Sequence, residues 1–142
     1  MPRKISKKSL KKKACAEFSR YIRLKYADKN GNNHCVTCGI VKHYKEMQAG
    51  HFVDGRNSTV LFEEMLVHPQ CFHCNSKHMG CLAGNKLKYT AFMMDKYKLT
   101  IEQVVELDNL KFKVKKMADA DYEEIYQKYK SLAKGLEDVK RT

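Results

Sequence analysis

The sequence predicts an α+β fold, mostly helical, with a small cysteine-containing core between helices at the two ends of the chain. Apolar residues recur with helical spacing near both ends, whereas residues 34–73 lack that period and contain two Cys-x-x-Cys pairs. We expect three regions: a basic head and helix at 1–33, the core at 34–85, and a helical region at 86–142. The 142 residues are 43% hydrophobic, so the core is small and a metal or a partner subunit would reinforce it.

Four helices are expected from the apolar pattern and from helix-capping residues. Turn-forming residues end the first helix at 28–33. Thr100 and Gln103 have the spacing of a capping box, which marks the start of a short third helix. The four segments are 9–27, 86–96, a short segment after Thr100, and 121–136.

The middle of the chain contains short segments compatible with β-strands. Residues 35–41 have the pattern of a tight knuckle that enters a strand, with Gly39 allowing the turn. Residues 47–53 and 59–62 are expected to pair across a turn at 54–58. A further helical turn is expected around the second cysteine pair.

The cysteine pairs predict a structural zinc site. In a chain read as cytosolic, disulfides are rare, and two pairs with the same spacing indicate a metal rather than reduced core thiols. Four thiolates supply the closed tetrahedron that structural Zn²⁺ prefers. The proposed ligands are Cys35, Cys38, Cys71 and Cys74, whereas Cys15 and Cys81 are expected to be ordinary buried thiols.

The net charge of +12 indicates a polyanionic partner, and nucleic acid fits better than a solvated tail or a membrane surface. Residues 1–13 contain seven Lys or Arg and no acid. No apolar run is long enough to span a bilayer, and no signal-peptide core follows the first residues, so we expect a soluble, cytoplasmic protein. The residues expected to contact phosphates are Lys11, Lys12, Lys13, Arg20, Arg23 and Arg56.

The segment Gln48-Ala-Gly-His51-Phe-Val53 lies between the cysteine pairs, and Asn75 directly follows the second pair. This order resembles the ββα-metal nucleases, also called HNH or His-Me finger enzymes, and especially phage endonuclease VII. In that family a catalytic histidine lies between the pairs and a metal-binding asparagine follows the last cysteine. The resemblance covers about residues 35–78 and implies a treble-clef core.

A second likeness extends over most of the chain and points to the NinG/Rap family of phage recombination proteins. The chain resembles that family in its later tyrosines and terminal helix and in Phe18-Ser-Arg-Tyr-Ile-Arg23, Cys35-Val-Thr-Cys38-Gly39, Gln48-Ala-Gly-His-Phe52, Gly55-Arg56, Val67-His68, Gln70-Cys71 and Cys74-Asn75. The likeness implies a structure-specific endonuclease for branched intermediates such as Holliday junctions and D-loops. The likeness also implies action in the bacterial host cytoplasm, if the protein is phage-encoded, and other phage recombination proteins as partners.

The resemblance gives each residue a role in phosphodiester hydrolysis. His51 would be the general base, since imidazole takes protons from water near neutral pH. Asn75 would hold a catalytic Mg²⁺ or Mn²⁺ through its amide oxygen, and Arg56 would hold the phosphate. Each also has a plain alternative: a satisfied core histidine, a helix cap and a turn residue.

Two positions depart from the nuclease pattern. The aspartate that precedes the histidine in endonuclease VII is Gly50 here, and the asparagine that orients the histidine in many HNH enzymes is Leu66. The second metal ligand therefore stays open among Glu46, Asp54, Glu63, Glu64, His68 and His78, of which His78 could share a helical face with Asn75.

Three functions remain after these observations. The first is a metal-dependent endonuclease for branched DNA, expected to be a homodimer because junction resolution needs two symmetric cuts. The second is a non-catalytic zinc module that binds nucleic acid, which Gly50 and Leu66 favour. The third is an accessory protein built on helix contacts.

Overall fold

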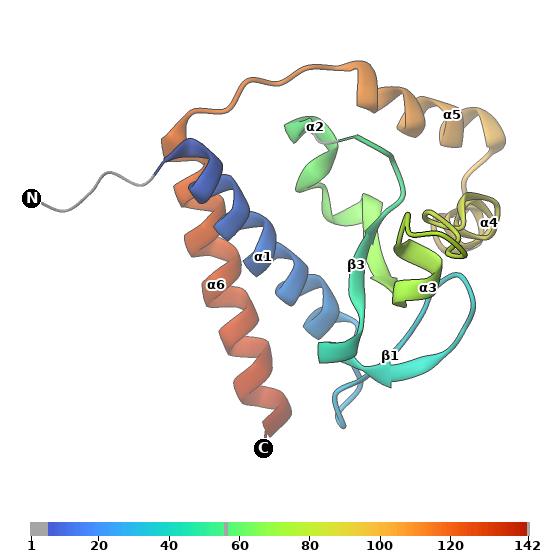
Figure 1. Cartoon of the computed structure of the whole chain (residues 1–142), viewed down its shortest axis with the longest axis horizontal. Helices are drawn as coiled ribbons and strands as arrows, with labels where there is room; N and C mark the ends of the chain where they lie inside the picture. The colour runs from blue at the N-terminus through green and yellow to red at the C-terminus, as the bar shows by residue number, and fades with distance from the viewer. Residues whose placement is uncertain (1–5, 56, 142) are drawn as a thin grey trace, which may run out of the picture.

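The computed structural model describes residues 6–55 and 57–141, and it has the predicted α+β, mostly helical composition (Figure 1). Arg56, to which two roles were assigned, lies outside the described residues. The helices are α1 Lys7–Lys25, α2 Ser58–Leu61, α3 Phe72–Asn75, α4 Lys86–Tyr97, α5 Ile101–Asn109 and α6 Asp119–Arg141, and the 3₁₀ turns are Tyr44–Glu46, Glu64–Leu66 and Leu110–Phe112. The strands are β1 Asn32–His34, β2 Val41–His43, β3 Gln48–His51 and β4 Val67–Gln70.

Helices α1 and α6 lie side by side and run in the same direction (Figure 1). The Ser6 side chain accepts the N–H of Ser9 and so begins α1. The apolar stripe of α1 packs on α6, where the rings of Phe18 and Tyr129 meet edge to face with centroids 4.8 Å apart. The final helix extends beyond the predicted 121–136 at both ends.

The first cysteine pair occupies the turn between β1 and β2, which pair antiparallel with His34 opposite Val41. The Gly39 N–H donates to the Cys35 carbonyl at 2.8 Å, and Gly39 has a φ of +81°, a conformation that favours glycine. The predicted knuckle is therefore present.

The predicted strand pairing of 47–53 with 59–62 is wrong. The Asn57 side chain accepts the N–H of Thr59 and caps α2, so this segment turns into a helix. Strand β3 pairs instead with β4, and His51 lies opposite Val67. Helix α3 follows β4 directly, with Cys71 at its N-cap and Cys74 inside it.

Helices α4 and α5 pack against residues that flank the β3–β4 hairpin. Their buried residues join a core that contains Phe52, Leu66, Tyr89, Met93 and Val104. The predicted capping box of Thr100 and Gln103 is confirmed, since both of its hydrogen bonds form. The segment 113–118 then crosses to α6, and α2 holds it through bonds from Ser58 and Thr59 to its backbone (Figure 1).

Candidate functional site

The four predicted zinc ligands meet at one point. Their sulfur atoms all lie within 4.8 Å of one another, and the sulfurs of Cys38 and Cys71 are 3.7 Å apart. Four thiolates about 2.3 Å from a tetrahedral zinc lie about 3.8 Å from each other. The cluster therefore fits a metal such as zinc, with one pair supplied by the β1–β2 turn and the other by α3.

The surroundings of the cluster stabilise thiolates unevenly. Burial acts to raise the pKa of Cys35, but bonds from the Thr37 hydroxyl and from backbone N–H groups of Cys71, Thr37 and Cys38 outweigh it and lower that pKa to about 6. Burial raises the pKa of Cys71 to about 12. A bound divalent cation would deprotonate both, because a coordinating thiol loses its proton.

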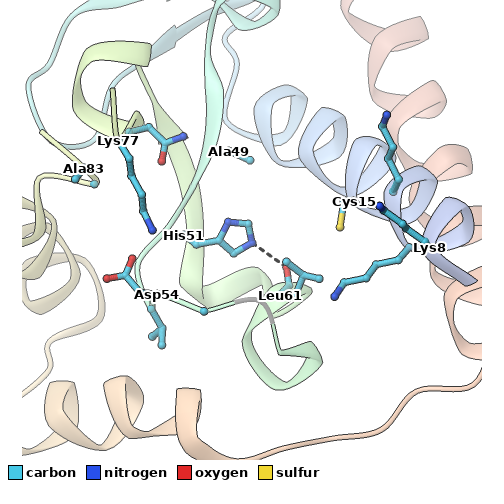
Figure 2. Close-up of a pocket in the computed structure, with 14 residues that line it drawn as sticks. Lys8, Cys15, Ala49, His51, Asp54, Leu61, Lys77 and Ala83 are labelled. Atoms are coloured by element: carbon cyan, nitrogen blue, oxygen red, sulfur yellow. Dashed lines mark hydrogen bonds between the residues drawn. The ribbon is translucent and has the colours of Figure 1, made fainter. Parts of the chain in front are cut away.

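Beside this cluster lies a cleft of about 740 Å³ that contains the predicted catalytic histidine. Figure 2 shows His51 with Lys77 and Asp54 on one side and with Lys8 and Cys15 of α1 on the other. Asn75 also lines the cleft, as do Ala49, Ala83 and Gly84. The fold therefore brings His51 and Asn75 together, as the sequence resemblance implied.

His51 is held in one orientation by a backbone group. Its Nε2–H donates to the Leu61 carbonyl at 3.0 Å, the dashed line in Figure 2. Because the carbonyl can only accept, the Nδ1 atom carries the lone pair in the neutral ring. Burial lowers the pKa of His51 below its usual value, although the bond to Leu61 acts in the opposite direction. The ring is therefore neutral near physiological pH, with its lone pair on Nδ1.

The Asn75 side chain is oriented by Gln48, a residue that our sequence analysis did not assign. Asn75 Nδ2 donates to Gln48 Oε1 at 2.7 Å. With its nitrogen turned toward β3, the amide presents its oxygen in another direction, where it can serve as a ligand for a hard cation. The one signal in the sequence for this role of Gln48 is that it lies three residues before the predicted histidine, His51.

The position that is aspartate in endonuclease VII is closed in this chain. A Cβ atom added to Gly50 would lie 1.8 Å from Gln70 Oε1. Gln70 is fully buried, and its Nε2 donates to Thr37 Oγ1 at 3.1 Å and to the Gly84 carbonyl at 2.9 Å. The space that a side chain at position 50 would need is therefore occupied.

The candidates for a second metal ligand differ in whether they line the cleft that contains His51 and Asn75. Asp54 is exposed and lines the cleft with His51 and Asn75. His68 is fully buried, its ring nitrogens bond the hydroxyls of Tyr89 and Tyr97, and burial lowers its pKa to about 3. The other candidates lie outside the described lining of the cleft: Glu46, Glu63, Glu64 and His78.

Two of those residues have other contacts. Glu64 accepts from Lys25 at 3.4 Å and from the Tyr129 hydroxyl at 3.2 Å. The His78 ring lies on Phe72, with centroids 5.8 Å apart. Leu66, compared in the sequence analysis with the orienting asparagine of HNH enzymes, is 1% exposed in the apolar core, and the Leu61 carbonyl is the group that bonds the His51 ring.

The predicted phosphate-binding residues also separate into two groups. Lys11 and Lys12 line the cleft together with Lys8, whereas Lys13 lies over the Tyr126 ring of α6. The Arg20 guanidinium pairs with Glu17 and Glu137. Arg23 donates to the carbonyls of Ser19 and Tyr44. Arg20 therefore links α1 to α6 and Arg23 links α1 to the turn at Tyr44, whereas Lys8, Lys11 and Lys12 border the cleft.

Cys15 and Cys81 are both partly exposed, so the expectation of ordinary buried thiols is wrong for them. Cys15 lines the cleft opposite His51.

Among the described helices, none has both the length and the apolar character needed to cross a membrane.

Comparison with known proteins gives one family. The family described as bacteriophage Lambda NinG protein matches residues 3–139 of this chain. Curated proteins and solved structures gave no match.

Proposed function

Because the chain belongs to the NinG family of bacteriophage lambda, we propose that it is a metal-dependent endonuclease that cuts branched DNA. One observation carries this proposal most directly: His51, oriented through Nε2, lies with Asn75 and Asp54 in a cleft bordered by lysines. A neutral base, oxygen ligands and cations for phosphate are the groups that phosphodiester hydrolysis needs.

In the proposed reaction, His51 Nδ1 accepts a proton from water as the water oxygen forms a bond to phosphorus. The bond from phosphorus to the 3′ oxygen breaks, and that oxygen receives a proton from solvent. Asn75 Oδ1 and an Asp54 carboxylate oxygen form a donor set suited to Mg²⁺ or Mn²⁺. Such a cation, when bound, stabilises the charge on the phosphate and the leaving oxygen.

The proposed zinc site would act as a scaffold. With four cysteines as ligands it has no open position for water, so it fits a structural role. The order of knuckle, hairpin and short helix is the order of a treble clef of the HNH type, with the base on β3 and Asn75 at the end of α3. This arrangement supports the nuclease proposal because it brings His51 and Asn75 to the same cleft.

The lysines suggest how DNA would lie. Lys8, Lys11 and Lys12 on α1 border one side of the cleft, and Lys77 borders the other. Contacts to phosphates fix position without reading sequence, which suits an enzyme that recognises shape. Two symmetric cuts in a four-way junction would require a twofold dimer, and other phage recombination proteins would be natural partners.

A non-catalytic DNA-binding module is the second candidate. The closed space at Gly50 favours it, because the acidic ligand of endonuclease VII cannot be accommodated there. Asp54 offers an acid from the following loop, which keeps the nuclease the better explanation.

The test is cleavage of a labelled four-way junction with Mg²⁺ or Mn²⁺ by the full chain. We expect wild type to cut, His51→Ala to lose about 100-fold or more in rate, as removal of a general base does, and His34→Ala to behave as wild type. His34 is an exposed histidine on β1 and lies outside the described cleft lining, so it is a matched control.

Binding of the junction without cleavage in either metal would refute the nuclease and leave the binding module. Equal cleavage by His51→Ala would remove His51 as the base.

A further inference from the structure

The loop of residues 76–85, between α3 and α4, forms one wall of the cleft through Lys77, Ala83 and Gly84. Its backbone is tied to the candidate metal centre, because Gly84 N–H donates to the Cys74 carbonyl at 2.7 Å and Leu82 N–H to the His73 carbonyl at 2.9 Å. A further bond joins Ala83 N–H to Ser76 O at 2.9 Å. These backbone hydrogen bonds hold the loop in one conformation against α3.

This loop carries apolar side chains on its outer surface. Met79 is fully exposed, with a relative exposure of 102%, and Leu82 is 47% exposed. Phe72, at the base of the loop, is 49% exposed and lies against the His78 ring. An apolar surface on a rigid, lysine-bearing loop indicates a binding role.

We propose that this loop reads the branch point: Lys77 holds a phosphate while Met79 and Leu82 pack on base faces that are unstacked there. This inference rests on the proposed function, since it names the feature of branched DNA that the same site recognises. Architectural DNA-binding proteins insert methionine or leucine between base steps in the same way.

Geometry places the apolar residues within reach of the bases. Lys77 extends into the cleft toward Asp54 (Figure 2). Met79 follows Lys77 by two residues, so their Cα atoms are at most about 7.6 Å apart. Phosphates rise about 3.4 Å per nucleotide along one strand. The two side chains therefore start from neighbouring points of one loop, close enough to contact the same branch point.

The chemistry distinguishes a branch from a duplex. In an intact duplex both faces of each base are covered by neighbours, and a side chain must unstack a step before it can pack there. At a branch the stack is already interrupted, so an apolar side chain gains contact without that penalty. A wedge on the outer surface of this loop, beside the cleft, would therefore favour branched over linear DNA.

The alternative occupant of this surface is a protein partner. Lys77 lies on the loop and Lys88 shortly after it, whereas Lys86 pairs with Asp108, and the described residues 76–85 include no acid. Such a positive surround is complementary to phosphates rather than to the mixed charges of a typical protein surface. DNA is the occupant that the charge favours.

The experiment uses 2-aminopurine, whose fluorescence reports stacking, placed at the branch of a four-way junction and at the centre of a linear duplex. Binding is measured in Ca²⁺ and cleavage in Mg²⁺ and Mn²⁺. The variants are Met79→Ser, the double variant Met79→Ser with Leu82→Ser, and the control Val105→Ser, an exposed apolar residue of α5.

We expect wild type to change the fluorescence of the junction and not of the duplex. Met79→Ser should weaken junction binding about tenfold, the loss expected when one buried apolar side chain is removed, with duplex affinity unchanged. Val105→Ser should behave as wild type. No fluorescence change with wild type, or an unchanged junction preference in the double variant, would overturn the wedge.

The two proposals fail separately. Cleavage by wild type without a change at the branch would refute the wedge and leave the nuclease. A wedge signal that Met79→Ser removes, without cleavage in either metal, would establish branch reading by a protein that is not a nuclease. A protein that binds neither DNA would refute both.

Discussion

Gly50→Ala tests whether the space beside β3 is as full as the structure indicates. An added Cβ would lie 1.8 Å from Gln70 Oε1, far inside any contact that real atoms make. Gln70 cannot easily move, because it is fully buried and its amide nitrogen donates to Thr37 and to the Gly84 carbonyl. The added methyl must therefore strain β3 or displace Gln70.

Both responses lower the free energy of unfolding. Overpacking a filled site costs about 1–3 kcal/mol, and each hydrogen bond lost by a displaced Gln70 costs about 1 kcal/mol. Since either response is enough to relieve the clash, we expect Gly50→Ala to destabilise the protein by about 1–3 kcal/mol. Gly50→Asp should be worse, because it also buries a charge.

The assay is urea unfolding followed by circular dichroism, with zinc kept in constant excess because a bound metal shifts apparent stability. A double-mutant cycle with Gln70→Ala isolates the contact. The double variant should be more stable than the sum of the single effects by about 1–3 kcal/mol. A Gly50→Ala protein as stable as wild type, or an additive cycle, would refute the reasoning.

Four further predictions concern the metal, the base and the pH. Chelation of zinc, or Cys74→Ser, should abolish the cooperative melting transition, and an unchanged transition would exclude a structural metal. Gln48→Ala should raise the Mg²⁺ concentration for half-maximal cleavage about tenfold, because second-shell partners orient ligands, whereas Gln48→Glu keeps the acceptor for Asn75 Nδ2. Since burial lowers the pKa of His51, the cleavage rate should rise with pH only up to a value below 6.5 and then stay level; an acid limb centred above 6.5 would contradict this. His68 has a pKa of about 3 in the folded protein, so the unfolded chain binds more protons below about pH 6.5, and the free energy of unfolding should fall between pH 7 and 5.

The helices could be predicted because local signals and tertiary packing agree. The apolar stripe that predicts α1 is the face that packs on α6, and Thr100 with Gln103 forms the predicted cap. In α6, Tyr129 of the predicted stripe is buried, but Leu132 is exposed and Ala133 takes the buried position. The hairpin partner could not be predicted in the same way. Strand β4 reads Val-His-Pro-Gln and is buried at every position, so it shows no alternation. The β-branched residues at 59–60 favoured a strand, but the Asn57 cap and contacts to 113–115 make a helix there.

In the candidate site too, features set by local sequence could be predicted, whereas features set by tertiary contacts could not. The cysteines could be predicted because the spacing within each pair already places two sulfurs on one ion. The orienting partner of His51 could not, because it is the main-chain carbonyl of Leu61, and any residue type at position 61 would supply it. The partner of Asn75 is a side chain, Gln48, but the contact depends on how β3 meets α3.

Strand alternation explains where an acidic ligand can enter this site. Successive residues of a strand point to opposite faces, and Ala49 and His51 both line the cleft. Gly50 therefore faces the other way, toward Gln70, and an aspartate there would collide with the buried Gln70 side chain. The loop that begins directly after Val53 is free of this constraint, and Asp54 lies in the cleft. In the proposed nuclease, the acidic ligand has moved from the strand to the loop, so Asp54→Asn should impair metal-dependent cleavage while leaving the fold intact.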